Sequence, residues 1–196
     1  ELASIGSTLK QGQVFDSNRY TIFGMLSRLG VEIEDLGAIP DDPALLEKTL
    51  KQAVENSDVV ITSGGVSVGE ADFMLQRLHK LGLVLFWLIA MKPGRPLAYG
   101  KIGNAHYFGL PGNPVAVMVT FYQFVRQALL GLMGQPSPAV LPMLNAVCMT
   151  PIRKLKGRTE FQRGILFLAD NGTLQVKTPG NQSSGVLSSM SQGNCF

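Results

Sequence analysis

The segment Asp58–Thr62 constrains the fold more than any other part of this chain. It is a short β-branched run with helical patterns on both sides. Such a run predicts a central parallel strand that is buried on both faces. Apolar residues at helical spacing follow Asp16–Asn18, a second helix is expected to begin at Pro43, and Leu83–Ile89 reads as a further buried strand. This alternation of strands and helices predicts a doubly wound α/β sheet.

Further elements follow from the same patterns, and a change of pattern marks a domain boundary. Strands are expected at Val31–Leu36, Leu97–Tyr99 and His106–Leu110, and helices at Ala71–Leu81 and Pro114–Met133. Glycine and proline are frequent over residues 131–142. Beyond this stretch, short strands are expected at Met143–Met149, Glu160–Leu168 and Leu174–Lys177, with a hairpin turn at Asp170–Gly172. We therefore expect an α/β domain over residues 1–133, a linker over 134–142 and a small β domain over 143–196.

Composition excludes several classes of protein. Hydrophobic residues make up 45% of the 196 residues and charged residues 16%, which is a globular composition. The net charge of +3 gives no case for nucleic acid, and a small polyanionic ligand fits better. No secretory signal is visible, and no apolar run approaches the roughly 18 residues of a membrane span. The cysteines Cys148 and Cys195 lack metal-binding spacing and read as structural residues of a reduced compartment.

A glycine-rich segment begins where the predicted central strand ends. Residues 63–72 read Ser-Gly-Gly-Val-Ser-Val-Gly-Glu-Ala-Asp. Ligands of open α/β sheets bind beyond the carboxyl ends of the strands. Glycines let the backbone approach a ligand, amides near a helix start can hold phosphate, and serines add hydroxyl donors. The predicted ligand-binding residues of this loop are Ser63, Gly64, Gly65, Ser67 and Gly69.

Two more loops follow predicted strands. Gly109–Pro114 brackets a Gly-Asn pair with two prolines before a helix, which would present helix amides to an anion, although an ordinary tight turn is the simpler reading of that pattern alone. Between the glycine-rich loops, Met91–Pro96 carries Lys92 and Arg95 on a stiff turn, a placement that favours anion binding.

Carboxylates lie near the same strand ends. Glu70 and Asp72 belong to the first glycine-rich loop, and Asp41 and Asp42 follow the strand expected to end near Leu36. Carboxylates only accept hydrogen bonds, so they suit magnesium, a hydroxyl or an amino group on a heterocycle. The simpler role of Asp72, Asp41 and Asp42 is to cap a following helix.

These segments, taken together and in order, closely resemble the MoeA family. The resemblance rests on Asp16–Arg19, Asp58–Asp72, Met91–Pro96, Gly109–Pro114, Phe161–Gly164 and Gly193–Phe196. It implies a three-layer MogA-like molybdopterin-binding domain, with its first strand before Glu1, followed by a small β domain cut short at Phe196. It also implies a cytoplasmic, homodimeric transferase with a MogA-type partner enzyme. Such enzymes insert molybdenum from molybdate into adenylylated molybdopterin and release AMP in a magnesium-dependent step.

The resemblance also implies roles for single residues. Asp41, Asp72, Lys92 and Glu1 would be catalytic, with Asp41 and Asp72 as magnesium ligands. One departure stands out, because Leu88 follows Trp87 where the family often has a lysine, so one cation for molybdate or phosphate is lost. Besides the loop residues named above, the ligand-binding residues would be Arg95, Pro111, Gly112, Asn113, Pro114, Arg163 and Ser183.

Two other functions stay open at this point. A MogA-like adenylyltransferase would attach AMP in the same cleft instead of releasing it. A non-catalytic dimerisation or scaffold module could use the long apolar helix at Pro114–Met133 as its interface. Product analysis separates the two enzymes, and sedimentation with peptide-binding tests addresses the scaffold.

Overall fold

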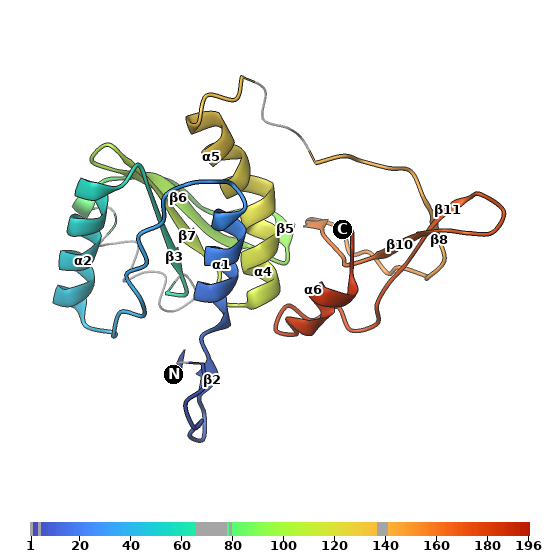
Figure 1. The fold of residues 1–196 in the computed structure, drawn as a ribbon, viewed down its shortest axis with the longest axis horizontal. Helices are drawn as coiled ribbons and strands as arrows, with labels where there is room; N and C mark the ends of the chain where they lie inside the picture. The colour runs from blue at the N-terminus through green and yellow to red at the C-terminus, as the bar shows by residue number, and fades with distance from the viewer. Residues whose placement is uncertain (1, 4, 66–77, 79, 137–140) are drawn as a thin grey trace. The chain divides into compact units, whose positions relative to one another are not determined.

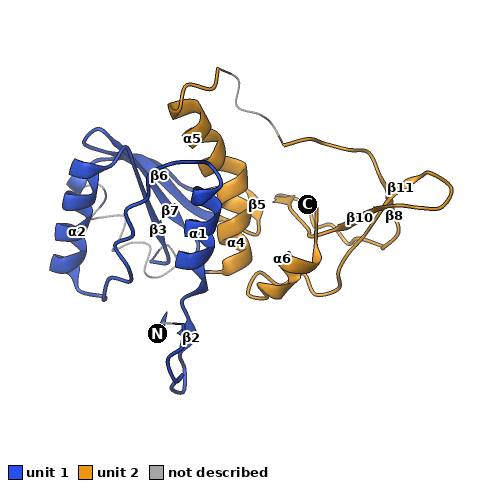
Figure 2. Ribbon diagram, in the orientation of Figure 1, with its two compact units in different colours: residues 1–87, 96–112 blue, residues 88–95, 113–196 orange. Residues whose placement is uncertain are grey.

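The computed structural model describes residues 2–3, 5–65, 78, 80–136 and 141–196 (Figure 1). The chain forms two compact units, and each is built from two separate stretches of the sequence (Figure 2). Unit 1 contains residues 1–87 and 96–112, and unit 2 contains residues 88–95 and 113–196. The linker expected at 134–142 follows from composition and stays a prediction.

The helices α1 (Ser17–Ser27) and α2 (Pro43–Asn56) of unit 1 each begin after an aspartate, as predicted. The Asp16 carboxylate accepts a hydrogen bond from the amide of Arg19 at 3.2 Å. Asp42 accepts from the amides of Ala44 and Leu45. Such caps satisfy amides that have no partner inside the helix and stabilise it by about 1 kcal/mol. Asp42, and not Asp41, is therefore the cap of α2.

Four strands form the sheet of unit 1 in the order β3-β7-β6-β4. β3 and β7 are parallel, with Val59 opposite His106 and Ser63 opposite Leu110, whereas β6 and β7, at the two strands expected around Leu97–Tyr99 and His106–Leu110, are antiparallel. A separate pair of two-residue strands, β1 and β2, is also parallel. The strands of unit 1 are β1 (Leu2–Ala3), β2 (Val14–Phe15), β3 (Val59–Ser63), β4 (Leu83–Leu88), β6 (Pro96–Ile102) and β7 (Ala105–Leu110).

Three strand predictions need correction. Among the residues that the structure describes, β3 lies at one edge of the sheet and not at its centre. β4 is the other edge, and Leu83 and Leu85 are 61% and 57% exposed because they alternate onto an uncovered face, so β4 is not a buried strand. Val31–Leu36 belongs to no strand. Alternating apolar residues do not make a strand without a hydrogen-bonded neighbour, and no described segment pairs with this one.

The core of unit 1 lies between α2 and one face of the sheet. Leu78 is also part of it and is helical, while most of the helix expected at Ala71–Leu81 falls outside the described residues. Gly100 lets β6 approach β4 closely, because a Cβ there would overlap the carbonyl oxygen of Leu83. The buried members of the cluster are Leu50, Ala53, Val60, Leu78, Ala98, Ile102, Ala105 and Tyr107.

A long helical run opens the main part of unit 2. It extends over Pro114–Leu132 and contains α4 (Pro114–Thr120), a π-helical stretch η1 (Phe121–Val125) and α5 (Arg126–Leu132). Contrary to the expectation from sequence, this run is long and apolar enough to cross a membrane by length and composition. A helix in a protein core meets the same test, and Val115, Val117 and Val119 are fully buried here. The run therefore does not identify a membrane span.

Short strands make up the rest of unit 2. β10 and β11 form an antiparallel hairpin whose turn is the predicted Asp170–Gly172, with Gly172 at φ 76°. β8 pairs with β11, and β9 pairs with β5. The strands expected at Met143–Met149 and Glu160–Leu168 are much shorter, because only part of each finds a partner. The remaining elements are β5 (Met91–Lys92), β8 (Val147–Cys148), β9 (Thr159–Glu160), β10 (Ile165–Leu168), β11 (Leu174–Lys177) and α6 (Ser188–Gln192).

We expect Gly100→Ala to lower the free energy of unfolding by about 1–3 kcal/mol, because the new Cβ would collide with the backbone of β4. Gly24→Ala is the matched control. Gly24 lies inside α1 with nothing within 4 Å of its Cβ position, so the same change should stabilise the protein by about 0.8–1 kcal/mol. Urea denaturation measures both. Equal effects of the two changes would contradict the close approach of β6 and β4.

Burial raises the pKa of Tyr107 to about 12, although its hydroxyl shares a hydrogen bond of 2.7 Å with that of Thr62. The unfolded chain loses this proton near pH 10 and the folded chain keeps it. The contribution to stability is therefore complete below pH 10 and falls by about 1.4 kcal/mol per pH unit between pH 10 and 12. Tyr107→Phe should remove this part of the slope in urea titrations. An unchanged slope would show that Tyr107 titrates normally.

Candidate functional site

The two glycine-rich loops of the sequence meet in unit 1. β3 and β7 are parallel neighbours, so both loops begin at the carboxyl ends of these strands, at the same end of the sheet. The amide of Gly64 donates to the carbonyl oxygen of Leu110 at 3.2 Å, and the Ser63 hydroxyl donates to that of Pro111 at 3.3 Å. A Cβ on Gly112 would lie 3.9 Å from the Cα of Gly64. We call residues 63–65 and 110–112 the loop pair.

Glycine is required at two positions of the loop pair. Gly64 and Gly65 have φ values of 87° and 68°, in the left-handed region that other residues rarely adopt. A Cβ on Gly64 would meet no atom within 4 Å, so its backbone borders open space. The predicted ligand-binding residues Ser63, Gly64 and Gly65 are thus placed beside Pro111 and Gly112.

Asn18, from the second position of α1, joins the two halves of the loop pair. Its side-chain nitrogen donates to the Ser63 hydroxyl at 2.8 Å and to the carbonyl oxygen of Gly112 at 2.7 Å. The sequence indicated no site role for Asn18, which was named only within the segment Asp16–Arg19, and Asp16 is the residue that caps α1. The Asp-Ser-Asn-Arg motif was the available signal, because its third residue, Asn18, lies two positions beyond the cap.

The cation-bearing turn, Lys92–Arg95, belongs to unit 2 and is held from two sides. Gly94 lies so close to the helix that a Cβ would be 2.6 Å from Cγ2 of the buried Thr120. On the other side, β5 pairs with β9, and Phe161 donates its amide to the carbonyl oxygen of Lys92 at 2.8 Å. The backbone of the turn is therefore fixed, while the Lys92 and Arg95 side chains are exposed.

Glu160 accompanies Lys92, and sequence reasoning missed it. Its carboxylate lies 3.9 Å from Lys92 Nζ, and the side chains are 8% and 53% exposed for Glu160 and Lys92 respectively. At this distance and exposure the attraction is weak, so the lysine is not immobilised. An incoming anion would compete with a single carboxylate for the ammonium group.

The start of α4 is occupied by a neighbouring loop. The amide of Val115 donates to the carbonyl oxygen of Ser184 at 3.2 Å, and the Asn113 side chain donates to its hydroxyl at 3.0 Å. Pro114, the first residue of the helix, has no amide proton. The expectation that this helix start presents its amides to an anion is wrong for Val115, because that amide already has a partner.

Arg163 is the largest fully buried side chain of the described chain, and its guanidinium serves the same loop. It donates to the carbonyl oxygens of Asn181, Gln182 and Ser183 and to the Ser189 hydroxyl, at 3.0 to 3.1 Å. Burial lowers the pKa of this guanidinium. Arg163 thus holds the segment that contains Ser183, and direct contact of either residue with a ligand stays a prediction.

Several predicted site residues, most of the predicted acids among them, cannot be placed. The residues that lie outside the described part of the chain are Glu1, Ser67, Gly69 and Asp72. Asp41 is exposed beside the α2 cap. Within the part of the chain that the structure describes, no three His, Cys, Asp or Glu side chains are grouped closely enough to hold a metal ion.

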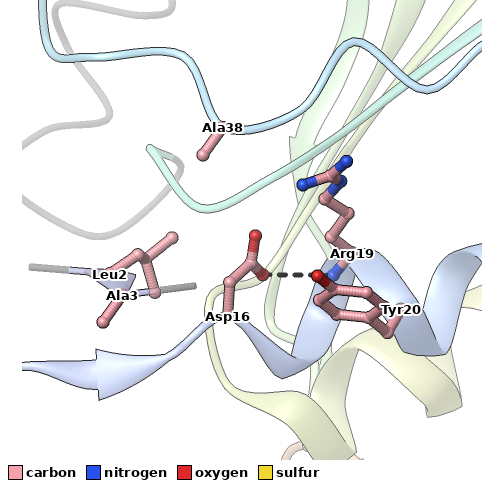
Figure 3. A pocket seen from close by; sticks show the side chains of 6 residues that line it. All are labelled: Leu2, Ala3, Asp16, Arg19, Tyr20 and Ala38. Atoms are coloured by element: carbon pink, nitrogen blue, oxygen red, sulfur yellow. Dashed lines mark hydrogen bonds between the residues drawn. The ribbon is translucent and has the colours of Figure 1, made fainter. Parts of the chain in front are cut away.

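A separate pocket in unit 1 carries no predicted site residue. Figure 3 shows Arg19 and Asp16 beside Leu2 and Ala3, with the carboxylate of Asp16 accepting the Arg19 amide. The Arg19 guanidinium donates to both carboxylate oxygens of Asp35 at 2.8 and 2.9 Å, and this hydrogen bonding lowers the pKa of Asp35. The charge of Arg19 is therefore already balanced within the protein.

Unit 1 is an α/β fold with paired glycine-rich loops, and short β segments follow it in the chain. Comparison with known proteins identifies the class of protein that has these features. Residues 1–131 match the model of a probable molybdopterin binding domain, and residues 145–196 match the MoeA C-terminal region (domain IV). The chain therefore belongs to the family of molybdopterin-binding domains and carries the C-terminal region of MoeA after it.

Named relatives agree with this assignment. The molybdopterin molybdenumtransferase of Haemophilus influenzae is 45% identical over 196 residues, which is all of this chain and 48% of that protein. The protein of the same name from a Nostoc species is 35% identical over 200 residues, covering 100% of this chain and 46% of the relative. The chain thus spans about half the length of these relatives.

A solved structure confirms the predicted fold class. The crystal structure of the MoeA molybdopterin biosynthesis protein from Pyrococcus horikosii matches with a TM-score of 0.79 and 27% identity. The match covers 98% of this chain and 46% of that one. The fold is the MogA-like α/β domain followed by a small β domain.

We expect Arg163→Lys to lower the free energy of unfolding by about 3 kcal/mol. Lysine lacks the planar fork that reaches three carbonyl oxygens at once, and buried acceptors would lose their donors. Arg153→Lys, on an exposed loop, is the control and should change stability by less than about 0.5 kcal/mol. Urea denaturation compares the two, and equal stabilities would show that the Arg163 contacts contribute little.

Proposed function

We propose that this chain is the catalytic part of a molybdopterin molybdenumtransferase. Such an enzyme inserts molybdenum from molybdate into adenylylated molybdopterin and releases AMP. Water adds across the phosphoanhydride bond and releases AMP. The two thiols of the pterin bind molybdenum, one molybdate oxygen leaves as water with their two protons, and molybdenum keeps its oxidation state. The observation that carries the proposal is the loop pair, two glycine-rich strand ends joined by Asn18 beside open space.

The loop pair supports a role in binding the organic substrate. Gly64 and Gly65 have left-handed backbone conformations, a Cβ on Gly64 would meet no atom within 4 Å, and peptide amides in such loops can bind phosphate oxygens. The Ser63 hydroxyl already donates to Pro111 and accepts from Asn18, so it fixes the loop more than it binds. Because the Gly64 amide already donates to Leu110, we propose that the amide of Gly65 holds the phosphate side of the pterin substrate.

The cation-bearing turn supports a role in binding molybdate. Lys92 and Arg95 are exposed on a backbone fixed by Thr120 and β9. Two cations at a fixed turn stabilise a dianion and the negative charge that develops when a phosphate bond breaks. Leu88 supplies no third cation, so we propose that Lys92 and Arg95 together attract molybdate.

The remaining parts of the proposal rest on the family resemblance. Asp41, Asp72 and Glu1 are proposed to orient reacting oxygens, and Asp41 with Asp72 to bind magnesium. The described residues alone do not provide a magnesium site, because no three His, Cys, Asp or Glu side chains are grouped among them, so no step is assigned to the metal. A cytoplasmic location, a homodimer and a MogA-type partner enzyme are proposed on the same ground.

Lys92→Ala should lower molybdate-dependent AMP release by about 10²–10³-fold, as expected when one well-placed charge at a reacting centre is removed. The assay uses the full-length protein, adenylylated molybdopterin and magnesium. Lys156→Ala, on an exposed loop, is the control and should keep full activity. Full activity of Lys92→Ala would reject the assigned role of the lysine.

The products also separate the other candidate functions. Attachment of AMP from ATP to free molybdopterin, without molybdate-dependent release, would identify a MogA-like adenylyltransferase. Neither activity in a folded dimer would favour a scaffold, and would direct attention to Leu88.

A further inference from the structure

The orientation of the Asn18 carboxamide is determined by its partners. The carbonyl oxygen of Gly112 can only accept a hydrogen bond, so the side-chain nitrogen of Asn18 must face it, at 2.7 Å. The same nitrogen donates to the Ser63 hydroxyl at 2.8 Å. Exchanging the two ends of the carboxamide would put two acceptors against each other. The oxygen, Oδ1, therefore points away from both partners.

This oxygen is buried and has no hydrogen-bond partner in the described part of the chain. Most buried polar atoms in proteins are paired, because an unpaired one loses its bonds to water without replacement. Holding the loop pair together uses only the nitrogen of Asn18. The two hydrogen bonds of the nitrogen therefore explain one end of the side chain, and the position of the oxygen is left unexplained.

The chemistry of an unpaired acceptor narrows the class of group that could satisfy it. Phosphate and molybdate oxygens, when ionised, only accept hydrogen bonds and would repel Oδ1. A donor is needed, and an amino group on a nitrogen heterocycle provides one. The loop pair leaves open backbone next to Asn18, since a Cβ on Gly64 would meet nothing within 4 Å.

We propose that Asn18 Oδ1 accepts a hydrogen bond from a heterocyclic amino group of the bound substrate. Asn18 then has two functions, because its nitrogen joins the glycine-rich loops and its oxygen selects a ligand that carries a donor. The inference rests on the proposed function, since adenylylated molybdopterin contains two heterocycles with amino groups, the pterin and the adenine. Either can be the source of the donor.

The test is a double-mutant cycle between Asn18 and the amino group of the ligand, by calorimetry on the full-length protein. One arm compares AMP with purine riboside 5′-monophosphate, which lacks the amino group. The other compares neopterin with its N2,N2-dimethyl derivative. In the arm that contains the true donor, the amino ligand should bind about tenfold more tightly to the wild type, or about 1.4 kcal/mol.

Asn18→Ala should abolish this preference in that arm, whereas a purely structural loss would weaken both ligands equally. Asn18→Asp keeps an acceptor oxygen and loses the hydrogen bonds to Ser63 and Gly112. This variant should bind both ligands more weakly and still prefer the ligand with the amino group. It also serves if the alanine variant does not fold. Asn56→Ala, at the exposed end of α2, is the matched control and should keep the tenfold preference.

The outcomes separate the inference from the proposed function. Binding of AMP or neopterin with no preference for the amino ligand in either arm, or with a preference that Asn18→Ala retains, overturns the role of Oδ1 and leaves the transferase proposal intact. No binding of either ligand class by the wild type overturns both.

Discussion

The parallel pairing of β3 and β7 is the constraint on which the candidate site of unit 1 depends. Its register places Ser63 opposite Leu110, so both strands end at the same level and both loops start there. A slip of one residue would turn every side chain of β3 to the opposite face and would separate Gly64 from Leu110. The hydrogen bonds of Asn18 are possible only in the observed register, since they need Ser63 and Gly112 on the same side.

Unit 2 is organised by a different interaction, a buried cation that has no carboxylate partner among the residues the structure describes. Arg163 is solvated by the carbonyl dipoles of Asn181, Gln182 and Ser183 instead of by a counter-ion. The ordering of these three carbonyls extends to Ser184, which accepts the first available amide of α4. A charge is costly to bury, but once its donors are satisfied it fixes several backbone groups at once, which an apolar side chain cannot do.

The sequence predicted best those features that depend on local chemistry. Helix starts at Asp16 and Asp42 need only a carboxylate in the right place, and the turn at Asp170–Gly172 needs only a residue that tolerates positive φ. Strands depend on neighbours that are distant in sequence. The alternation at Val31–Leu36 therefore predicted a strand that is not present, and the apolar run at β4 predicted burial where an edge leaves leucines exposed.

The candidate site shows the same division. The sequence places Ser63 and Gly64 at a strand end, because the β-branched run stops at Thr62 and two glycines follow Ser63. The partner of Asn18 on the second loop could not be predicted, since Asn18 and Gly112 are 94 residues apart and only the register of β3 and β7 brings them together. For Arg163, the family motif suggested a ligand contact, whereas the fold surrounds the guanidinium with carbonyl oxygens that no sequence pattern indicates.

The capping of α4 by Ser184 changes where negative charge can be accommodated. A free helix start offers fixed amides that favour an anion of one size and position. With the Val115 amide occupied, the proposed attraction for an oxyanion rests on Lys92 and Arg95, whose side chains are exposed on a fixed backbone turn. Long side chains adapt to the ligand where a helix start does not. In the proposed transferase, that arrangement would suit molybdate, which must first be captured and then change its coordination when sulfur replaces oxygen.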